Sequence, residues 1–84
     1  PGIPTISKNW NYNAKRKELT LDLSQKQEIP FVFPLEILVK TSDGKEIRKT
    51  LEIKNSEEHF RFKIKSSVSD IQLDPETKLL FQEV

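Results

Sequence analysis

The chain has 84 residues, with 14 basic and 13 acidic side chains, a formal net charge of +1 and 35% hydrophobic residues. This length predicts one domain over residues 1–84 with a modest core, and the interleaved charges argue against the one-sided basic surface of a nucleic-acid-binding protein. The absence of cysteine excludes disulfides, thiolate nucleophiles and thiolate zinc sites. No apolar run approaches the roughly 18 residues of a membrane-spanning helix.

The N-terminus carries neither a methionine nor a recognisable signal peptide, and it begins with Pro1-Gly2-Ile3-Pro4. We therefore expect the chain to have been cut from a longer polypeptide, with the loss of any targeting signal. From there on, apolar and polar residues alternate, which is the pattern of half-buried β-strands.

The first two strands are predicted over residues 5–12 and around residues 19–23, with a polar turn between them. Their apolar stripes are Ile6, Trp10 and Tyr12 in the first strand and Leu19, Leu21 and Leu23 in the second. Lys8 interrupts the first stripe, which indicates an irregular strand or one at the edge of a sheet.

The third strand, predicted over residues 31–41, is apolar at every odd position up to residue 39. These inward residues are Phe31, Phe33, Leu35, Ile37 and Val39. Pro34 has the outward parity and cannot donate a ladder hydrogen bond, so we expect it at an edge or a bulge.

The segment Ser42-Asp43-Gly44 connects this strand to a fourth one with inward residues Ile47, Leu51 and Ile53. If both strands turn their odd residues inward and pair, the numbers of opposed residues sum to an even number. A two-residue Asp-Gly turn breaks this rule, whereas a three-residue loop with a left-handed Gly44 obeys it. The three-residue loop is predicted, unless the two strands belong to different sheets.

The rest of the chain predicts three more strands. Their apolar residues are Phe60, Phe62 and Ile64 in the fifth strand, Val68, Ile71 and Leu73 in the sixth, and Leu79, Leu80 and Phe81 in the last, which is expected over residues 78–83. The sequence Asp74-Pro75-Glu76-Thr77 has the residues of a type I turn. Seven short strands separated by turns indicate an all-β protein, either a β-sandwich or a small barrel.

Residues that could carry chemistry are few. Glu57-Glu58-His59 is the only place where a histidine lies among carboxylates, and a catalytic zinc site normally takes three protein ligands. We interpret this segment as a solvated turn that leads into a strand. Because the sequence also has no glycine-rich phosphate loop and no serine–histidine constellation, we expect no catalytic, metal-binding or cofactor-binding residue in this chain.

Two further groups of residues have a functional and a structural interpretation. Trp10 and Tyr12 could stack on sugars, but large aromatic residues of a small sandwich more commonly belong to its core. Arg61, Lys63 and Lys65 form a basic stripe, but alternating charges are ordinary on the wet face of a strand. We favour the core for the aromatic pair and a solvated face for the basic stripe.

Several apolar residues have the outward parity and predict a docking surface. Val32 and Leu38 lie on the outer side of the third strand, at least one residue of Leu79-Leu80-Phe81 must point away from the core, and Val84 follows. The candidates for contact with another domain of the parent chain are Val32, Leu38, Leu80 and Val84. The alternative, that loops cover the outer face of the sheet, stays open.

The order of motifs along the chain resembles one known family. The motifs are Gly2-x-Pro4, Trp10-x-Tyr12, Leu19-x-Leu21, Gln25 and Gln27, Phe31-x-Phe33-Pro34-Leu35-Glu36-Ile37, Asp43-Gly44, Val68, Ile71-x-Leu73-Asp74-Pro75 and Leu79-Leu80. They resemble the β-sandwich domain that follows the catalytic region in the M1 family of zinc aminopeptidases. The similarity is greatest to bacterial members whose chain ends soon after this domain.

The resemblance implies a seven-stranded antiparallel β-sandwich of the immunoglobulin or fibronectin type III kind, packed as an accessory domain on the catalytic domain of the same parent chain. The family binds zinc through an HExxH helix, which is absent here, so zinc is expected only in the parent catalytic domain. The resemblance also favours an extracytoplasmic location. The alternative is a stand-alone binding or adhesion module for protein or carbohydrate, which would expose Trp10 or Tyr12 rather than an apolar patch around Leu38, Leu80 and Val84.

Overall fold

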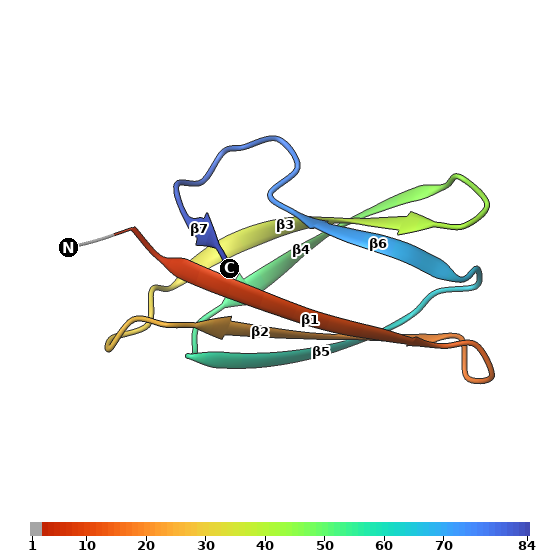
Figure 1. Ribbon diagram of the computed structural model, residues 1–84, viewed down its shortest axis with the longest axis horizontal. Helices are drawn as coiled ribbons and strands as arrows, with labels where there is room; N and C mark the ends of the chain where they lie inside the picture. The colour runs from red at the N-terminus through yellow and green to blue at the C-terminus, as the bar shows by residue number, and fades with distance from the viewer. Residues whose placement is uncertain (1–2) are drawn as a thin grey trace.

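The computed structural model describes residues 3–84, which form seven strands in two packed sheets (Figure 1). The strands are β1 (Thr5–Asn13), β2 (Glu18–Gln25), β3 (Phe33–Thr41), β4 (Glu46–Ile53), β5 (Glu57–Lys63), β6 (Val68–Leu73) and β7 (Gln82–Glu83). One sheet has the order β5-β2-β1-β7 and the other has the order β4-β3-β6. The predicted all-β sandwich is confirmed. Pro1 and Gly2, including the Gly2 of the first motif, lie outside the described residues.

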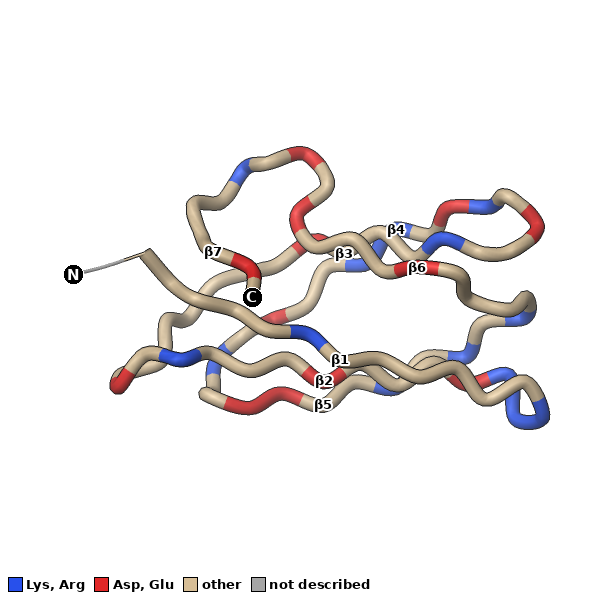
Figure 2. The backbone as a smooth tube through the Cα atoms, in the orientation of Figure 1, with Lys and Arg blue, Asp and Glu red and all other residues tan. Residues whose placement is uncertain are grey.

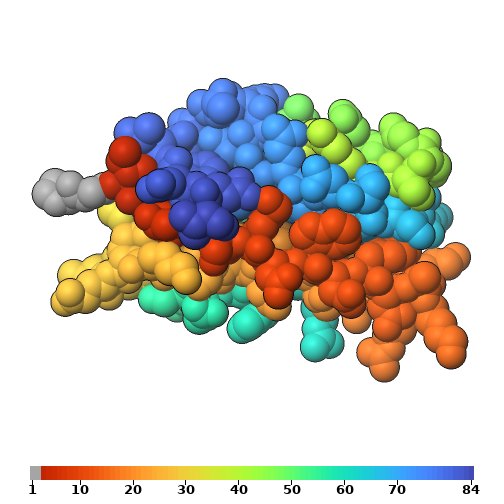
Figure 3. Space-filling view, viewed as in Figure 1, coloured from red at the N-terminus to blue at the C-terminus, as the bar shows by residue number. Residues whose placement is uncertain are grey.

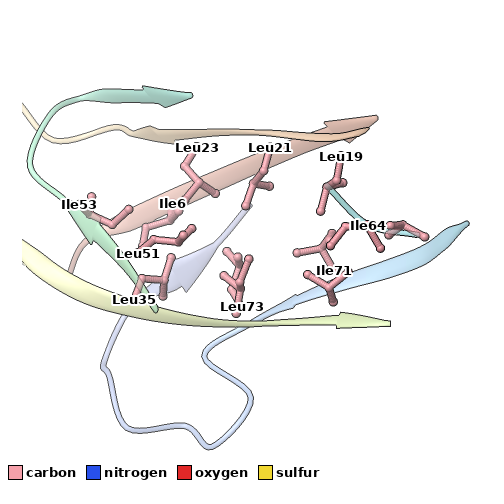
Figure 4. Packing of buried hydrophobic residues seen from close by; sticks show 13 residues of the cluster. Ile6, Leu19, Leu21, Leu23, Leu35, Leu51, Ile53, Ile64, Ile71 and Leu73 are labelled. Carbon is pink, nitrogen blue, oxygen red and sulfur yellow. The ribbon is translucent and has the colours of Figure 1, made fainter. Parts of the chain in front are cut away.

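The core lies between the inner faces of the two sheets and is aliphatic throughout (Figure 4). Its buried members are Ile6, Leu19, Leu21, Leu23, Leu35, Ile37, Val39, Leu51, Ile53, Ile64, Val68, Ile71 and Leu73. The aromatic residues are only partly buried and pack around this cluster. Each fully buried aliphatic side chain contributes about 1.5–3 kcal/mol relative to an exposed one, so the alternation of residues directly stabilises the sandwich.

The last strand differs from its prediction. β7 consists of Gln82–Glu83 alone and runs parallel to β1, so the sandwich is not antiparallel throughout. The chain leaves β6 through Asp74 and Thr77, whose φ values of 46° and 51° are incompatible with an extended strand. Residues 78–81 then cross to the other sheet without strand pairing, and the N–H groups of Lys78 and Leu79 donate to the Asp74 carboxylate instead of to a neighbouring strand.

The third strand also begins later than predicted, at Phe33 rather than at residue 31. Phe31 is exposed, and its backbone N–H and C=O bond the side chain of Gln25 instead of a neighbouring strand. The odd-position pattern was therefore correct from Phe33 onward and wrong at Phe31.

Pro34 lies where the central strand β3 has a neighbour on one side only. The Asp74 N–H donates to the Glu36 carbonyl (2.8 Å), so even-numbered residues of β3 direct their backbone groups towards β6. The pairing of β3 with β6 begins at Ile37, which leaves Pro34 beyond the end of β6. Because a proline has no N–H to donate, it is tolerated at this locally open edge, as its parity predicted.

The connection between β3 and β4 is the predicted three-residue loop. Val39 pairs with Ile47, so the numbers of opposed residues sum to an even number. The Thr41 N–H donates to the Lys45 carbonyl (3.0 Å), and Gly44 has a φ of 85°. This left-handed glycine lets the hairpin close while both strands keep their odd residues on the core.

We predict that Leu21→Ala destabilises the chain by about 2–5 kcal/mol, because it opens a cavity in the middle of the aliphatic layer. The matched control is Leu80→Ala, the same substitution at an exposed side chain, which should change the free energy of unfolding by less than about 0.5 kcal/mol. Urea denaturation of both variants measures the difference. Equal losses at the two positions would contradict the core described above.

Candidate interdomain surface

The exposed large hydrophobic side chains of residues 3–84 all belong to three segments that meet at one end of the molecule. These side chains are Ile3, Ile29, Phe31, Val32, Leu80 and Val84. Figure 1 shows that the segment before β1, the β2–β3 connection and the segment around β7 converge at the end where the N-terminus lies. We call this surface the apolar end.

A groove of about 260 Å³ lies in the middle of the apolar end. It is lined by Pro4, Phe31, Val32, Phe33, Leu79, Leu80 and Phe81. The groove therefore combines residues that are far apart in the sequence. The space-filling view shows the last residues of the chain lying against the first strand (Figure 3).

Three of the four predicted contact residues lie at the apolar end. Val32, Leu80 and Val84 are 69%, 75% and 63% exposed. Leu38 is only 6% exposed, because it lies on the outer face of β3 between Arg48 of β4 and Gln72 of β6 in the sheet register. Leu38 therefore offers almost no surface to a partner, whereas a contact role for the other three residues stays a prediction.

The sequence interpretation missed Ile3, Ile29 and Phe31 as members of this surface. Ile29 and Phe31 flank Pro30 in a stretch where the two-residue alternation has not yet begun. An interrupted alternation next to a proline was the available signal for a connection that exposes apolar residues.

The side chain of Gln25 holds the β2–β3 connection in place. Gln25 is buried, and its amide acts as a substitute for a backbone group: Oε1 accepts from the Phe31 N–H and Nε2 donates to the Phe31 carbonyl, both at 2.9 Å. Gln27 continues the network, since its Nε2 donates to Gln25 (2.8 Å) and its Oε1 accepts from the Thr5 N–H (2.7 Å). This network connects the backbone of Phe31 to Thr5, the first residue of β1.

Asp74 fixes the other apolar segment. Its two carboxylate oxygens accept from the backbone N–H groups of Lys78 (3.0 Å) and Leu79 (2.8 Å), and its carbonyl accepts from Thr77 (3.0 Å). The predicted turn over residues 74–77 is thus present, and the buried carboxylate orders the chain beyond it. The exposed Leu80 follows directly after this ordered turn.

Charged side chains attach the same connection to the outer face of β3 and β4. Arg48 lies 3.3 Å from Glu76, and Lys78 lies 3.2 Å from Glu76 and 3.6 Å from Glu36. The hydrogen bond to Glu76 and the charge of Glu36 raise the pKa of Lys78. Exposed ion pairs contribute little individually, so this group acts mainly by orienting the connection.

Trp10 and Tyr12 are partly buried and pack against the aliphatic core, as predicted. The Tyr12 hydroxyl donates to the Ile64 carbonyl (2.6 Å), which ties β1 to the connection between the two sheets. The two aromatic rings therefore contribute to packing around the core, which is the interpretation favoured from the sequence.

Glu57, Glu58 and His59 are the first residues of β5, so the interpretation of this segment as a turn was wrong. His59 lies on the outer face of the β5-β2-β1-β7 sheet. Its Nδ1 is 2.7 Å from Oδ1 of Asp22 on the adjacent strand, and the hydrogen bond to Asp22 is the main reason why the pKa of His59 is raised. Within residues 3–84, no group of three or more His, Cys, Asp or Glu side chains is arranged to hold a metal ion. That part of the chain also has no helix long and apolar enough to cross a membrane.

Comparison with known proteins gives a match in structure only. No protein-family model matches the chain, and no curated protein matches it by sequence. The crystal structure of aminopeptidase A from Legionella pneumophila in complex with aspartic acid matches with a TM-score of 0.85 at 21% sequence identity. The match covers 99% of this chain and 10% of that chain. The predicted resemblance to a domain of an aminopeptidase is thus confirmed in the fold, and the chain spans only a tenth of the length of the matched protein.

We predict that Gln25→Ala destabilises the chain by about 1–3 kcal/mol, because the Phe31 N–H and C=O lose their partners in a partly buried position. The control is Gln72→Ala on the exposed face of β6. Hydrogen exchange should become faster at the Phe31 amide in the Gln25 variant alone. Unchanged exchange at that amide would show that the connection is held by other contacts.

The His59–Asp22 pair predicts that the stability of the chain depends on pH. Because the folded state raises the pKa of His59, the pair stabilises the chain fully below the unfolded pKa of about 6.5, and this contribution is lost as the pH rises through the folded pKa. The melting temperatures of the wild type and of His59→Gln should therefore differ more at about pH 5.5 than at about pH 9. A difference that grows with pH would refute this interpretation.

Proposed function

We propose that this chain is a non-catalytic accessory domain of an M1-type zinc aminopeptidase, and that its apolar end packs on the catalytic region of the same polypeptide. The observation that carries the proposal is the convergence of the exposed large hydrophobic side chains on one end of the molecule. The fold match supports it, because the same architecture recurs as one part of a large aminopeptidase.

The apolar end has the character of an internal interface. Single exposed apolar residues need no explanation, but a contiguous group around a groove usually marks a contact with another protein surface. Val32, Leu80 and Val84 are each more than half exposed, so a partner that covers them would gain much of the about 1.5–3 kcal/mol available for each side chain. The groove between Phe31 and Leu80 would receive side chains of that partner.

The position of the N-terminal segment favours a partner in the same chain. Ile3 and Pro4 lie at the apolar end, and the Pro4 carbonyl accepts from the Gln82 N–H (2.8 Å). A catalytic region linked ahead of residue 1 would therefore emerge beside the groove that it has to cover. Such a link gives the contact a high effective concentration without any additional binding energy.

In this proposal the domain contributes no reacting group. The zinc ion and its ligands belong to the catalytic region, and the domain supports the part of that region on which it packs. Because Gln25 and Asp74 fix both apolar segments within the domain, the surface is already organised before it meets its partner. The domain would then act by holding the wall of the catalytic cleft in one position.

The most direct test is the coding sequence upstream of Pro1. We expect an HExxH motif within a few hundred codons, in the same reading frame. A reading frame without such a motif would contradict the proposal and would favour a stand-alone binding module.

A second test uses the parent polypeptide. Val32→Asp and Leu80→Asp should each weaken the contact between the domain and the catalytic region by about 2–4 kcal/mol, because a buried carboxylate would replace an apolar contact. Thermal unfolding and limited proteolysis near residue 1 measure this loss. Thr20→Asp on the polar outer face of β2 is the control, and the isolated 84-residue chain should tolerate all three substitutions. If the parent protein tolerated the two apolar-end variants as well as the control, the apolar end would not be its interface.

A further inference from the structure

The end opposite the apolar end is built by three connections. They are residues 14–17 between β1 and β2, residues 42–45 between β3 and β4, and residues 64–67 between β5 and β6. The Ile64 N–H donates to the Lys17 carbonyl (2.9 Å), and the Ser42 N–H donates to the Ser67 carbonyl (2.8 Å), so the three connections form one surface. We call this surface the basic tip.

The fold concentrates positive charge at the basic tip. Its three connections carry five of the 14 basic side chains and one of the 13 acidic ones, which gives a formal charge of +4 there and −3 over the rest of the chain. The basic members are Lys15, Arg16, Lys17, Lys45 and Lys65. Figure 2 shows these basic segments at the end away from the N-terminus. Glu18 and Glu46, the first residues of β2 and β4, are the acidic residues at its margin.

A hollow of about 230 Å³ lies between two of these connections. It is lined by Thr41, Lys45, Ile47, Lys63, Ile64, Lys65 and Ser66, so three lysines surround a hollow that also contains two isoleucines.

The environment beside this hollow already stabilises one carboxylate, that of Asp43. Its oxygens accept hydrogen bonds from the hydroxyls of Thr41 and Ser66, and Lys45 Nζ lies 3.9 Å away. These contacts lower the pKa of Asp43, the hydrogen bond from Thr41 most of all. The basic tip therefore favours the ionised form of the Asp43 carboxylate, and its basic side chains still outnumber this one acidic side chain.

We propose that the basic tip binds a carboxylate-rich segment of a protein partner. The charge surplus provides the attraction. Lys45 and Lys65 at the rim of the hollow would pair with acidic side chains of the partner, whereas the Lys63 ammonium already donates to the Arg16 carbonyl (3.2 Å). This inference does not depend on the proposed function, because the basic tip lies at the opposite end of the molecule from the groove that would pack on the catalytic region. With the apolar end covered, the tip would remain accessible.

The composition of the tip favours a protein partner over other anions. None of the exposed large hydrophobic side chains of the described residues lies there, so the tip has neither the apolar residues that anchor a protein in a bilayer nor the aromatic platforms on which nucleic-acid bases stack. Only one of the five basic residues, Arg16, is an arginine, the residue type that binds phosphate groups in a bidentate manner. The four lysines act as separate point charges, and each can pair with a different carboxylate of an acidic segment.

The test titrates fluorescently labelled poly-L-glutamate with the 84-residue chain and follows fluorescence anisotropy. We expect saturable binding that weakens about tenfold between about 20 mM and about 200 mM NaCl, because salt screens such contacts. The variant Lys15→Glu/Lys65→Glu should bind about tenfold more weakly than the wild type. The control Lys26→Glu/Lys54→Glu changes the net charge by the same amount outside the tip and should stay within about twofold of the wild type.

Three outcomes would overturn the proposal. The first is the absence of binding at low salt. The second is an equal loss in both double variants, which would assign the binding to net charge rather than to the tip. The third is tighter binding to phosphatidylserine vesicles or to duplex DNA than to poly-L-glutamate, which would identify a different class of partner. Circular dichroism of both variants establishes that they are folded, and Lys17→Glu/Lys45→Glu serves as a second tip variant if the first is not.

Discussion

The aliphatic contact between the inner faces of β2 and β3 is the constraint on which the rest of the molecule depends. Leu19, Leu21 and Leu23 alternate with polar residues on β2, and Leu35, Ile37 and Val39 are the buried odd-numbered residues of β3. Because every long strand runs from one end of the sandwich to the other, all connections gather at the two ends. The core thus determines where the loops lie, and their sequences then make one end apolar and the other basic.

Two buried polar side chains hold in place the segments that lie outside the strands. The segment around Phe31 and the segment around Leu80 are both outside the strands, and neither has a neighbouring strand to bond. Gln25 provides the first with a donor and an acceptor, and Asp74 provides the second with two acceptors. Buried polar groups of this kind are costly unless they are satisfied, and here they are satisfied by the backbone of the segments that they position. The apolar end is therefore ordered by these hydrogen bonds together with the packing of Phe33, Leu79 and Phe81 against the core.

The alternation in the sequence predicted the existence of the first six strands and the form of the β3–β4 loop, because the period of two assigns each side chain to a face. It did not predict where β3 and β5 begin. The same pattern cannot say which strands are neighbours. It therefore missed the parallel pairing of β7, and it gave no warning that neighbours in the sheet would cover Leu38. It also missed the concentration of charge at the tip, since Lys15, Lys45 and Lys65 are separated by about thirty and twenty residues and meet only through topology. The sequence therefore predicted which side chains of a strand are buried and three residues of the apolar end, but it did not predict which distant segments form one surface.

The two ends of the sandwich, and not its core, carry the features that are specific to this chain. The sandwich requires only aliphatic residues at alternate positions, so many sequences can satisfy it, and the fold alone does not identify a partner. The information specific to this chain lies in what its two ends present: a groove beside the N-terminal segment at one end, and a surplus of lysine at the other. Covering an apolar surface gains free energy by removing it from water, whereas a charged surface is well solvated and gains less from being covered. Our two proposals accordingly give the apolar end a permanent neighbour and the basic tip a reversible one.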